Sequence, residues 1–264
     1  MQLEKRVCYL GDDDATRAAA YLCGVLTNRG IAFDRVDSGT SPSADFQNRA
    51  YSLYVVSDYP RSCFGAGDME HIVERVREDG AGLLMLGGWE SYFGRLGEYH
   101  NSPLAEILPV EMSDSDDRRN YWSPVLLRPT TLDHPILADL PWETAPGVGG
   151  FNRFDAKAGA TVLLEGIRTK TTWKKTVAAD LNADDIQIEF VEKYPFLVVD
   201  DLGAGRVAAF ASDVAPHWIG GMVDWGQERV FQELPAALGD GLFVEIGAEY
   251  AKFFAQLVSW VGKF

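Results

Sequence analysis

Apolar runs alternate with segments of helical periodicity over the first hundred residues. The runs RVCYLG (6–11), IAFDRVD (31–37), YSLYVVSD (51–58) and AGLLMLGG (81–88) predict four strands. The stretches 17–30 and 68–80 carry apolar residues three and four positions apart and predict two helices. Because the strands are continuous apolar runs and helices separate them, they predict a parallel sheet with helices on both faces. The predicted fold class is therefore a doubly wound, mostly parallel α/β sheet.

The second half of the chain is less regular. GATVLLEG (159–166) predicts another core strand, and the two apolar runs of PFLVVDDLGAGRVAAF (195–210) predict a hairpin that turns at glycines. Residues from about 167 to 193 are polar and charged, which predicts a surface insertion in a β-rich region. Apolar residues at 250, 253, 254, 257 and 258 predict a C-terminal helix that packs on the core. We expect one domain over residues 1–264.

Composition narrows the setting. The chain of 264 residues has a formal net charge of -15, which argues against a nucleic-acid partner because such binding requires clustered Lys and Arg. It has no apolar run near the ~20 residues that span a membrane, and the cytoplasm is the expected location. Three cysteines are too few for a disulfide scaffold and are expected to be reduced thiols. GAGR (203–206) is not followed by a helix, so no phosphate loop and no cofactor is predicted.

The candidate site lies just past the ends of the strands. Ligands of open parallel sheets bind outside the carboxyl ends of the strands, so the loops that follow strands are the places to search. The loops GDDDAT, SDYPRSCFG, GGWESYFGRLGEYH and SDVAPHWIGG hold titratable and aromatic groups. The predicted ligand cleft comprises Gly87, Gly88, Trp89, Glu90, Ser91, His100, Asp213 and His217.

Several of these segments resemble a known family. GLLMLGGWESYFG, GEYHNSPLAEILPVEM, DHPIL, GFNR and PFLVVDDLGAGRVAAFASDVAPHW follow, in order, segments of the "putative glutamine amidotransferase-like" family of cytoplasmic proteins. This family lies within the class I glutamine amidotransferase-like superfamily. The resemblance runs from about residue 52 to the C-terminus, apart from the insertion, and implies a flavodoxin-like sheet.

The resemblance also implies where a nucleophile would stand. Glutaminases of the superfamily carry a G-x-C-x-G elbow after this strand, and a histidine and a carboxylate activate the cysteine. Here the bend reads Gly87-Gly88-Trp89-Glu90-Ser91, and Trp89 occupies the place of the cysteine. Because indole cannot attack a carboxamide, glutaminase activity is not expected. The leading hypothesis is a catalytically degenerate domain that binds a small molecule or a protein.

Two alternatives stay open. The first is a hydrolase or other enzyme with a site rebuilt around His217, His100 and Ser91, with Asp213 either orienting His217 or accepting backbone hydrogen bonds. A metal ion is a variant of this alternative, since His100, His217, Asp213 and Glu90 are suitable ligand types, but their spacing has no metal-site regularity and no metal is predicted. The second is a structural role as a homo-oligomer, suggested by the seven tryptophans.

Overall fold

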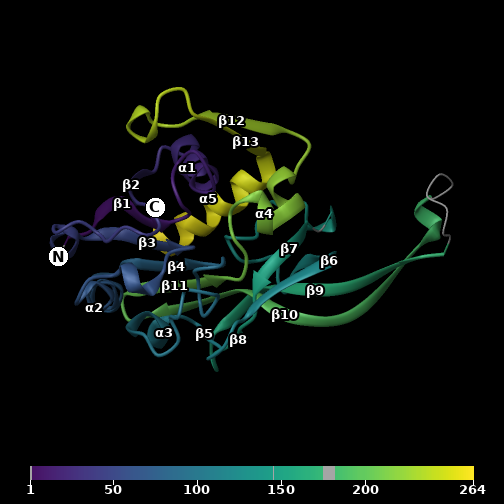
Figure 1. The fold of residues 1–264 in the computed structure, drawn as a ribbon, viewed down its shortest axis with the longest axis horizontal. Coiled ribbons are helices and arrows are strands. Elements are labelled where there is room, and N and C mark those ends of the chain that lie inside the picture. Colours follow the sequence, from purple (N-terminus) through teal and green to yellow (C-terminus); the bar gives the residue numbers. More distant parts are fainter. Residues whose placement is uncertain (1, 145, 175–181) are drawn as a thin grey trace.

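The computed structural model describes residues 2–144, 146–174 and 182–264. Within these residues, nine strands form one sheet in the order β2-β1-β3-β4-β11-β10-β9-β6-β7 (Figure 1). Two small two-stranded sheets, β12-β13 and β5-β8, accompany it. The strands of the large sheet are β1 (Glu4–Gly11), β2 (Ala32–Val36), β3 (Tyr51–Ser57), β4 (Gly82–Leu86), β6 (Arg118–Pro129), β7 (Gly147–Asn152), β9 (Thr161–Trp173), β10 (Ile186–Leu202) and β11 (Gly205–Phe210). Those of the small sheets are β5 (Val110–Glu111), β8 (Asp155–Ala156), β12 (Arg229–Glu233) and β13 (Phe243–Gly247).

The parallel part of the sheet confirms the predicted fold class. Neighbouring strands in the order β2-β1-β3-β4-β11 all pair in parallel. This is the flavodoxin-like order, with β11 in the place of a fifth strand. The four apolar runs read from the sequence form β1, β2, β3 and β4, and β3 and β4 are buried along their whole length.

The remaining strands β10, β9, β6 and β7 extend the sheet in antiparallel fashion. The predicted hairpin is confirmed as β10-β11, which turns between Leu202 and Gly205. The predicted insertion falls on the outer ends of β9 and β10, which form an arm that projects from the body of the molecule (Figure 1). Trp173, Ile188 and Phe190 are exposed on this arm. Residues 175–181 of the insertion lie outside the described residues.

Helices cover both faces of the parallel strands. The helices are α1 (Ala19–Asn28), α2 (Asp68–Glu74), α3 (Pro103–Ile107), α4 (Pro216–Ile219) and α5 (Ala248–Gly262). In Figure 1, α1 and α5 lie on one face and α2 and α3 on the other. The apolar stripe predicted for the last helix is buried in α5, where Phe253 and Phe254 both contact the ring of Phe210. Among the described residues, every helix is too short or too polar to cross a membrane.

Candidate functional site

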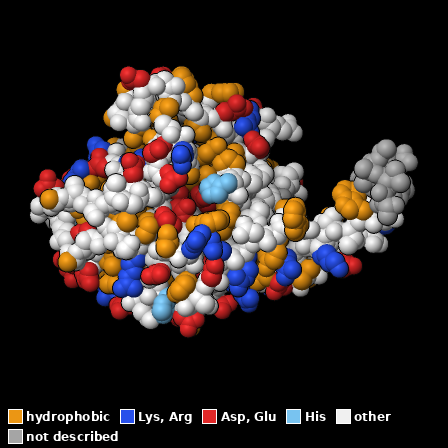
Figure 2. All heavy atoms as spheres, in the orientation of Figure 1, with side chains coloured by type: hydrophobic (Ala, Val, Ile, Leu, Met, Phe, Trp, Pro, Cys, Tyr) orange, Lys and Arg blue, Asp and Glu red, His pale blue; other side chains and the backbone are white. Residues whose placement is uncertain are grey.

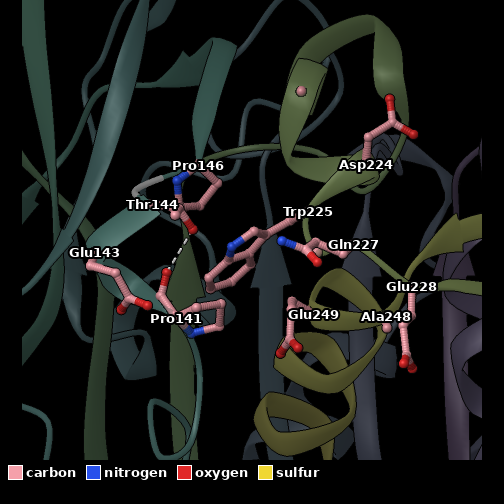
Figure 3. Close-up of a pocket in the computed structure, with 12 residues that line it drawn as sticks. Pro141, Glu143, Thr144, Pro146, Asp224, Trp225, Gln227, Glu228, Ala248 and Glu249 are labelled. Carbon is pink, nitrogen blue, oxygen red and sulfur yellow. Dashed lines mark hydrogen bonds between the residues drawn. The ribbon is translucent and has the colours of Figure 1, made fainter.

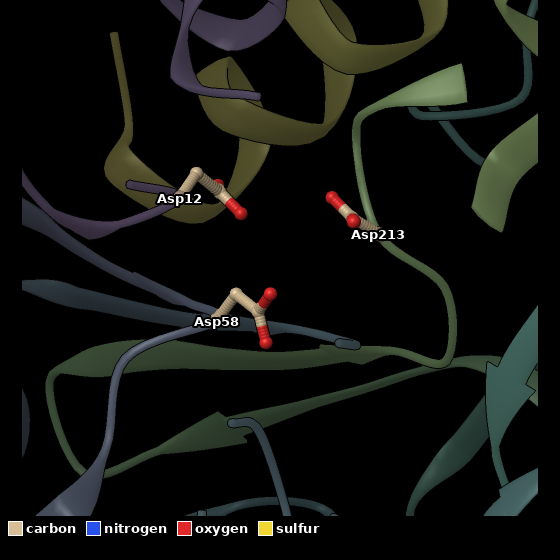
Figure 4. Close-up of side chains that lie close together, drawn as sticks. All are labelled: Asp12, Asp58 and Asp213. Carbon is tan, nitrogen blue, oxygen red and sulfur yellow. The ribbon is translucent and has the colours of Figure 1, made fainter. Parts of the chain in front are cut away.

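Three aspartates meet where the strand order reverses. After β1 the chain continues into α1 on one face of the sheet, whereas after β3 it continues into α2 on the other (Figure 1). Open parallel sheets bind their ligands at such a reversal. Asp12 directly follows β1, Asp58 directly follows β3, and Asp213 lies three residues beyond the end of β11. One carboxylate oxygen from each lies within 4.8 Å of the others. Figure 4 shows the three side chains pointing into a shared space.

The backbone at these strand ends is held in an uncommon conformation. Asp12 and Asp58 have positive φ angles of 58° and 47°. These angles lie in the left-handed region, which residues other than glycine seldom adopt. The amide of Asp12 donates to the carbonyl of Ser57 at 2.9 Å. A Cβ on Gly11 would lie 1.6 Å from that same carbonyl oxygen, so only glycine permits this close approach. The two aspartates are therefore fixed by the main chain.

Burial places these carboxylates under electrostatic stress. Asp12 is 1% exposed and Asp213 is 0% exposed. Desolvation, followed by the charges of Asp213 and Asp58, raises the pKa of Asp12 well above its usual range. Desolvation and then the charge of Asp213 raise the pKa of Asp58 to about 7. A proton or a cation therefore stabilises the cluster.

Asp213 holds both the backbone and a histidine. Its Oδ1 accepts hydrogen bonds from the amides of Val214 and Ala215. Its Oδ2 lies 2.8 Å from Nε2 of His217 on α4, without the alignment of an N–H hydrogen bond. The contact with Asp213 raises the pKa of His217. Asp213 thus contacts both kinds of partner considered for it from the sequence, the backbone amides and His217.

A cleft of about 490 Å³ opens above the aspartates. Trp89 is 45% exposed at its edge, and the guanidinium of Arg118 lies 4.6 Å from the centroid of the indole ring. In Figure 2, acidic side chains gather in the middle of this face, beside an exposed histidine. The structure thus brings the bend after β4 and the segment after β11 to one cleft, lined by Asp13, Asp58, Trp89, Glu90, Asn120, His217 and Trp218.

The bend after β4 is bound tightly to its surroundings. The amide of Gly87 donates to the carbonyl of Ser212 at 2.9 Å, and the amide of Gly88 donates to Oδ1 of Asn152 at 2.8 Å. A Cβ on Gly88 would lie 2.5 Å from a carboxylate oxygen of Asp58, so this position has no room for a side chain. Ser91 is buried, and its Oγ accepts a hydrogen bond from the amide of Asp58 at 2.9 Å. Ser91 thus lies beneath the cleft and is not among the residues that line it.

The prediction that His100 shares this cleft needs correction. His100 lines a separate depression together with Ser102, Glu106 and Lys157. The reason is local packing: the buried Tyr99 donates its hydroxyl to the carbonyl of Tyr59, and Oγ of Ser102 accepts from an amide at the start of α3. Tyr99 and Ser102 thus anchor the chain on either side of His100 and Asn101.

Sequence reasoning missed Asp12. The loop GDDDAT was recognised as a strand-end loop, and the first of its aspartates is the residue that a parallel strand delivers to the crevice. An acidic residue directly after the first strand was therefore an available signal. The three cysteines lie elsewhere: Cys8 and Cys23 are buried, and Cys63 is half-buried and outside the lining of the cleft. Burial raises the pKa of Cys23 to about 12.

A second cavity of about 670 Å³ lies beside Trp225. Figure 3 shows Glu143, Asp224 and Glu249 around it, with the indole of Trp225 between them. The ring of Trp225 packs against Trp142 with centroids 4.9 Å apart. Among the described residues, none of the three strand-end aspartates lines this cavity. We therefore place the candidate site at the strand-end cleft.

Known structures resemble this chain in fold. The cytoplasmic protein STM3548 from Salmonella typhimurium is 21% identical, with a TM-score of 0.67, and 97% of this chain aligns with 98% of that one. The cytoplasmic protein STM1381 from Salmonella typhimurium LT2 is 23% identical, with a TM-score of 0.66 and coverages of 97% and 99%. A thua-like protein from Parabacteroides merdae is 12% identical, with a TM-score of 0.55 and coverages of 99% and 90%.

These likenesses show the fold. No curated protein matches the sequence. A family profile does match: the one described as "Putative glutamine amidotransferase" covers residues 61–234, which include the bend, Asp213 and His217. The chain therefore belongs to this glutamine amidotransferase-like family.

Proposed function

We propose that this chain is a binding member of the family that has lost glutaminase chemistry and holds a small molecule in the strand-end cleft. The observation that carries the proposal is the bend, where Trp89 stands at the cleft and no cysteine is among the lining residues. Glutamine hydrolysis requires a thiolate that attacks the carboxamide, with a histidine to exchange the proton. His217 and Asp213 supply the second part of that machinery without the first.

The cleft suits a polar ligand with a flat or apolar portion. The exposed face of Trp89 offers a stacking surface, and His217 offers a hydrogen-bonding group on the cleft. Asp13, Asp58 and Glu90 make the lining acidic, which supports the expectation that nucleic acid is not a partner. A cytoplasmic location and a homo-oligomer stay predictions.

The alternative of a rebuilt enzyme rests on a different observation. A serine mechanism finds no support, because Ser91 binds the amide of Asp58 and His100 lies in another depression. The buried carboxylates of Asp12 and Asp213, together with the half-buried carboxylate of Asp58, favour the variant that uses a metal ion.

A glutaminase assay tests the leading proposal. Purified protein is incubated with glutamine beside an active glutaminase, released ammonia is measured, and intact mass is recorded after exposure to a diazo-ketone analogue of glutamine. We expect no ammonia above the blank and no added mass. Ammonia release that Cys63→Ala abolishes would refute the loss of glutaminase chemistry.

A fluorescence screen tests binding. Small polar metabolites are titrated into the wild type and into Trp89→Phe, which keeps a ring but removes the indole signal. We expect at least one compound to quench the wild type and not the variant. A response that is identical in the two proteins would place the ligand away from the cleft.

A further inference from the structure

In each of the three strand-end aspartates, one carboxylate oxygen accepts a hydrogen bond from the protein. Oδ2 of Asp12 accepts from the hydroxyl of Tyr9, Oδ1 of Asp58 accepts from the amide of Glu90, and Oδ1 of Asp213 accepts from two backbone amides. These donors fix the orientation of each carboxylate, as the outer partners of metal-binding side chains do.

The other oxygens are the unusual feature. Oδ1 of Asp12 and Oδ2 of Asp213 are closed to solvent, and neither accepts a hydrogen bond among the described residues, although Oδ2 of Asp213 lies 2.8 Å from Nε2 of His217. Ser57 Oγ, at the end of β3, is a further buried polar atom without one. Leaving a buried acceptor unpaired costs roughly 1–3 kcal/mol, and more for a charged group. Native structures seldom tolerate several such atoms together unless a water, an ion or a ligand satisfies them.

Cationic side chains do not neutralise the cluster. Within the described ranges 2–144, 146–174 and 182–264, no Lys or Arg forms an ion pair with any of the three aspartates. Arg35 donates instead to the carbonyl of Gly11 and pairs with Asp37. Arg118 pairs with Asp116. Among the basic side chains of these ranges, His217 forms the ion pair with the cluster, through Asp213.

The dimensions of the cluster suit a single ion. Two oxygens on opposite sides of an octahedral Mg²⁺ lie about 4.2 Å apart, twice the usual metal–oxygen distance, and about 4.8 Å apart around Ca²⁺. The aspartate oxygens lie within 4.8 Å of one another, so small side-chain rotations place one cation in contact with all three. Figure 4 shows the space between them.

We propose that Asp12, Asp58 and Asp213 bind one divalent cation of the hard, oxygen-preferring class, Mg²⁺ or Mn²⁺. The ligands are all carboxylates, which this class prefers over thiolates and imidazoles. His217 acts as a positioning residue through Asp213. The inference rests on the proposed function, since the ion forms the floor of the same cleft, and Asp58 lines that cleft. The remaining coordination positions face the bound small molecule.

A metal ion fits better than an organic cation. Oδ1 of Asp12 and Oδ2 of Asp213 are closed to solvent, so an ammonium group would have to bring its carbon chain into a packed region. A monatomic ion requires only the space between the carboxylates. Competition between an alkylamine and Mn²⁺ distinguishes the two occupants.

The test is a titration of metal-free full-length protein with Mn²⁺, followed by electron paramagnetic resonance and isothermal calorimetry. We expect one site per chain, displacement by Mg²⁺ and no displacement by methylamine. Asp12→Asn removes one carboxylate and should weaken Mn²⁺ binding by at least ~10-fold, because even the loss of outer-shell partners has effects of this size. Asp58→Asn gives a second ligand variant in case Asp12→Asn does not fold.

The matched control is Asp117→Asn. Asp117 is also buried, at 2% exposed, but three donors satisfy its oxygens. The Mn²⁺ affinity of the Asp117→Asn protein should stay within ~3-fold of the wild type, since Asp117 lies outside the cluster. Absence of Mn²⁺ binding to folded wild type, equal affinity in Asp12→Asn, or displacement by methylamine would overturn the metal site. None of these results bears on ammonia release, so the two proposals fail separately.

Discussion

Two buried acidic regions of this molecule are built in opposite ways. Around Asp117, the amides of Phe93 and Gly94 and the side chain of Asn152 donate to the carboxylate at 3.1, 3.0 and 2.7 Å. Around Asp12, the hydroxyl of Tyr9 holds one oxygen and the other has no donor. A buried acid whose oxygens have donors costs the fold less than one with an unpaired oxygen, which destabilises the fold until something binds. We infer that the first region is structural and the second is functional.

The two regions meet at the bend after β4. Asn152 accepts from the amide of Gly88 and donates to Asp117, so it ties the bend to the structural region. On the other side, Asp58 accepts from the amide of Glu90 and its own amide donates to Ser91. The bend that carries a nucleophile in the glutaminases serves here as a rigid wall between the two regions.

The largest stability effect is expected from Asn152→Ala. The change leaves the amide of Gly88 without a partner in the interior and removes one of the two donors to Oδ1 of Asp117, and should lower the free energy of unfolding by roughly 3 kcal/mol. Urea unfolding measures it. Asn120→Ala, an exposed asparagine on the same cleft, is the control and should change stability by less than about 0.5 kcal/mol. Equal effects of the two variants would contradict the structural role of the first region.

The pH dependence of metal-free protein tests the second region. The carboxyl of Asp58 faces Asp12, Asp213, Glu90 and His217, and its folded pKa of about 7 lies above the unfolded value. The folded state therefore holds an extra proton between these values, and stability should fall by roughly 2 kcal/mol as pH rises from about 5 to about 8. The raised pKa of His217 acts in the same direction, because its stabilising charge is lost as pH rises.

Chemical unfolding in the presence of a chelator, at both ends of this range, provides the measurement. Asp58→Asn should reduce the change in the free energy of unfolding between these two pH values. A free energy of unfolding that rises with pH in the wild type would show that the ionised carboxylates of the cluster do not destabilise the folded protein.

Asp12→Asn should stabilise the metal-free protein. Replacing a buried carboxylate beside two others removes repulsion, and a gain of about 1 kcal/mol is expected near pH 8. Asp117→Asn is the matched variant and should destabilise, because an amide cannot accept all three donors. A loss of stability of similar size in both variants would contradict the inference that the region around Asp117 is structural and the region around Asp12 is functional.

The smallest effect is expected from Trp89→Ala. The indole is half-exposed at the edge of the cleft and stacks on Arg118, so its removal should change stability by less than about 1 kcal/mol. Metal affinity should stay within ~3-fold, because the indole is not a ligand. Thermal denaturation and Mn²⁺ titration of the variant measure both, and a large loss of Mn²⁺ affinity would place the ion nearer the edge than the floor.

The sequence predicted the parallel half of the sheet and the convergence of its loops better than the details of the site. Apolar runs without alternation identified β1, β3 and β4 because burial on both faces leaves that pattern. The prolines in 118–129 obscured β6, which pairs over much of its length despite them. The direction of His100 depended on how Tyr99 packs, which no local pattern reveals.

Asp12 is a site residue that the sequence does not single out. An aspartate after a strand is common, and only the positions of Asp58 and Asp213 make it notable. Its unpartnered oxygen is a property of three-dimensional packing and leaves no sign in the sequence. The spacing of metal ligands along the chain was likewise uninformative, since three separate strand ends deliver them.

The most direct test of the central claim is the melting temperature of metal-free protein before and after addition of Mg²⁺. A ligand that binds only the folded state stabilises it by about 2.7 kcal/mol at 100 times its Kd. We predict a rise of several degrees for the wild type and for Asp117→Asn measured from its own baseline, and no rise for Asp12→Asn. A wild-type melting temperature that does not respond to Mg²⁺ or Mn²⁺ at about 10 mM, or an equal response in Asp12→Asn, would contradict the claim that the strand-end aspartates form a metal site.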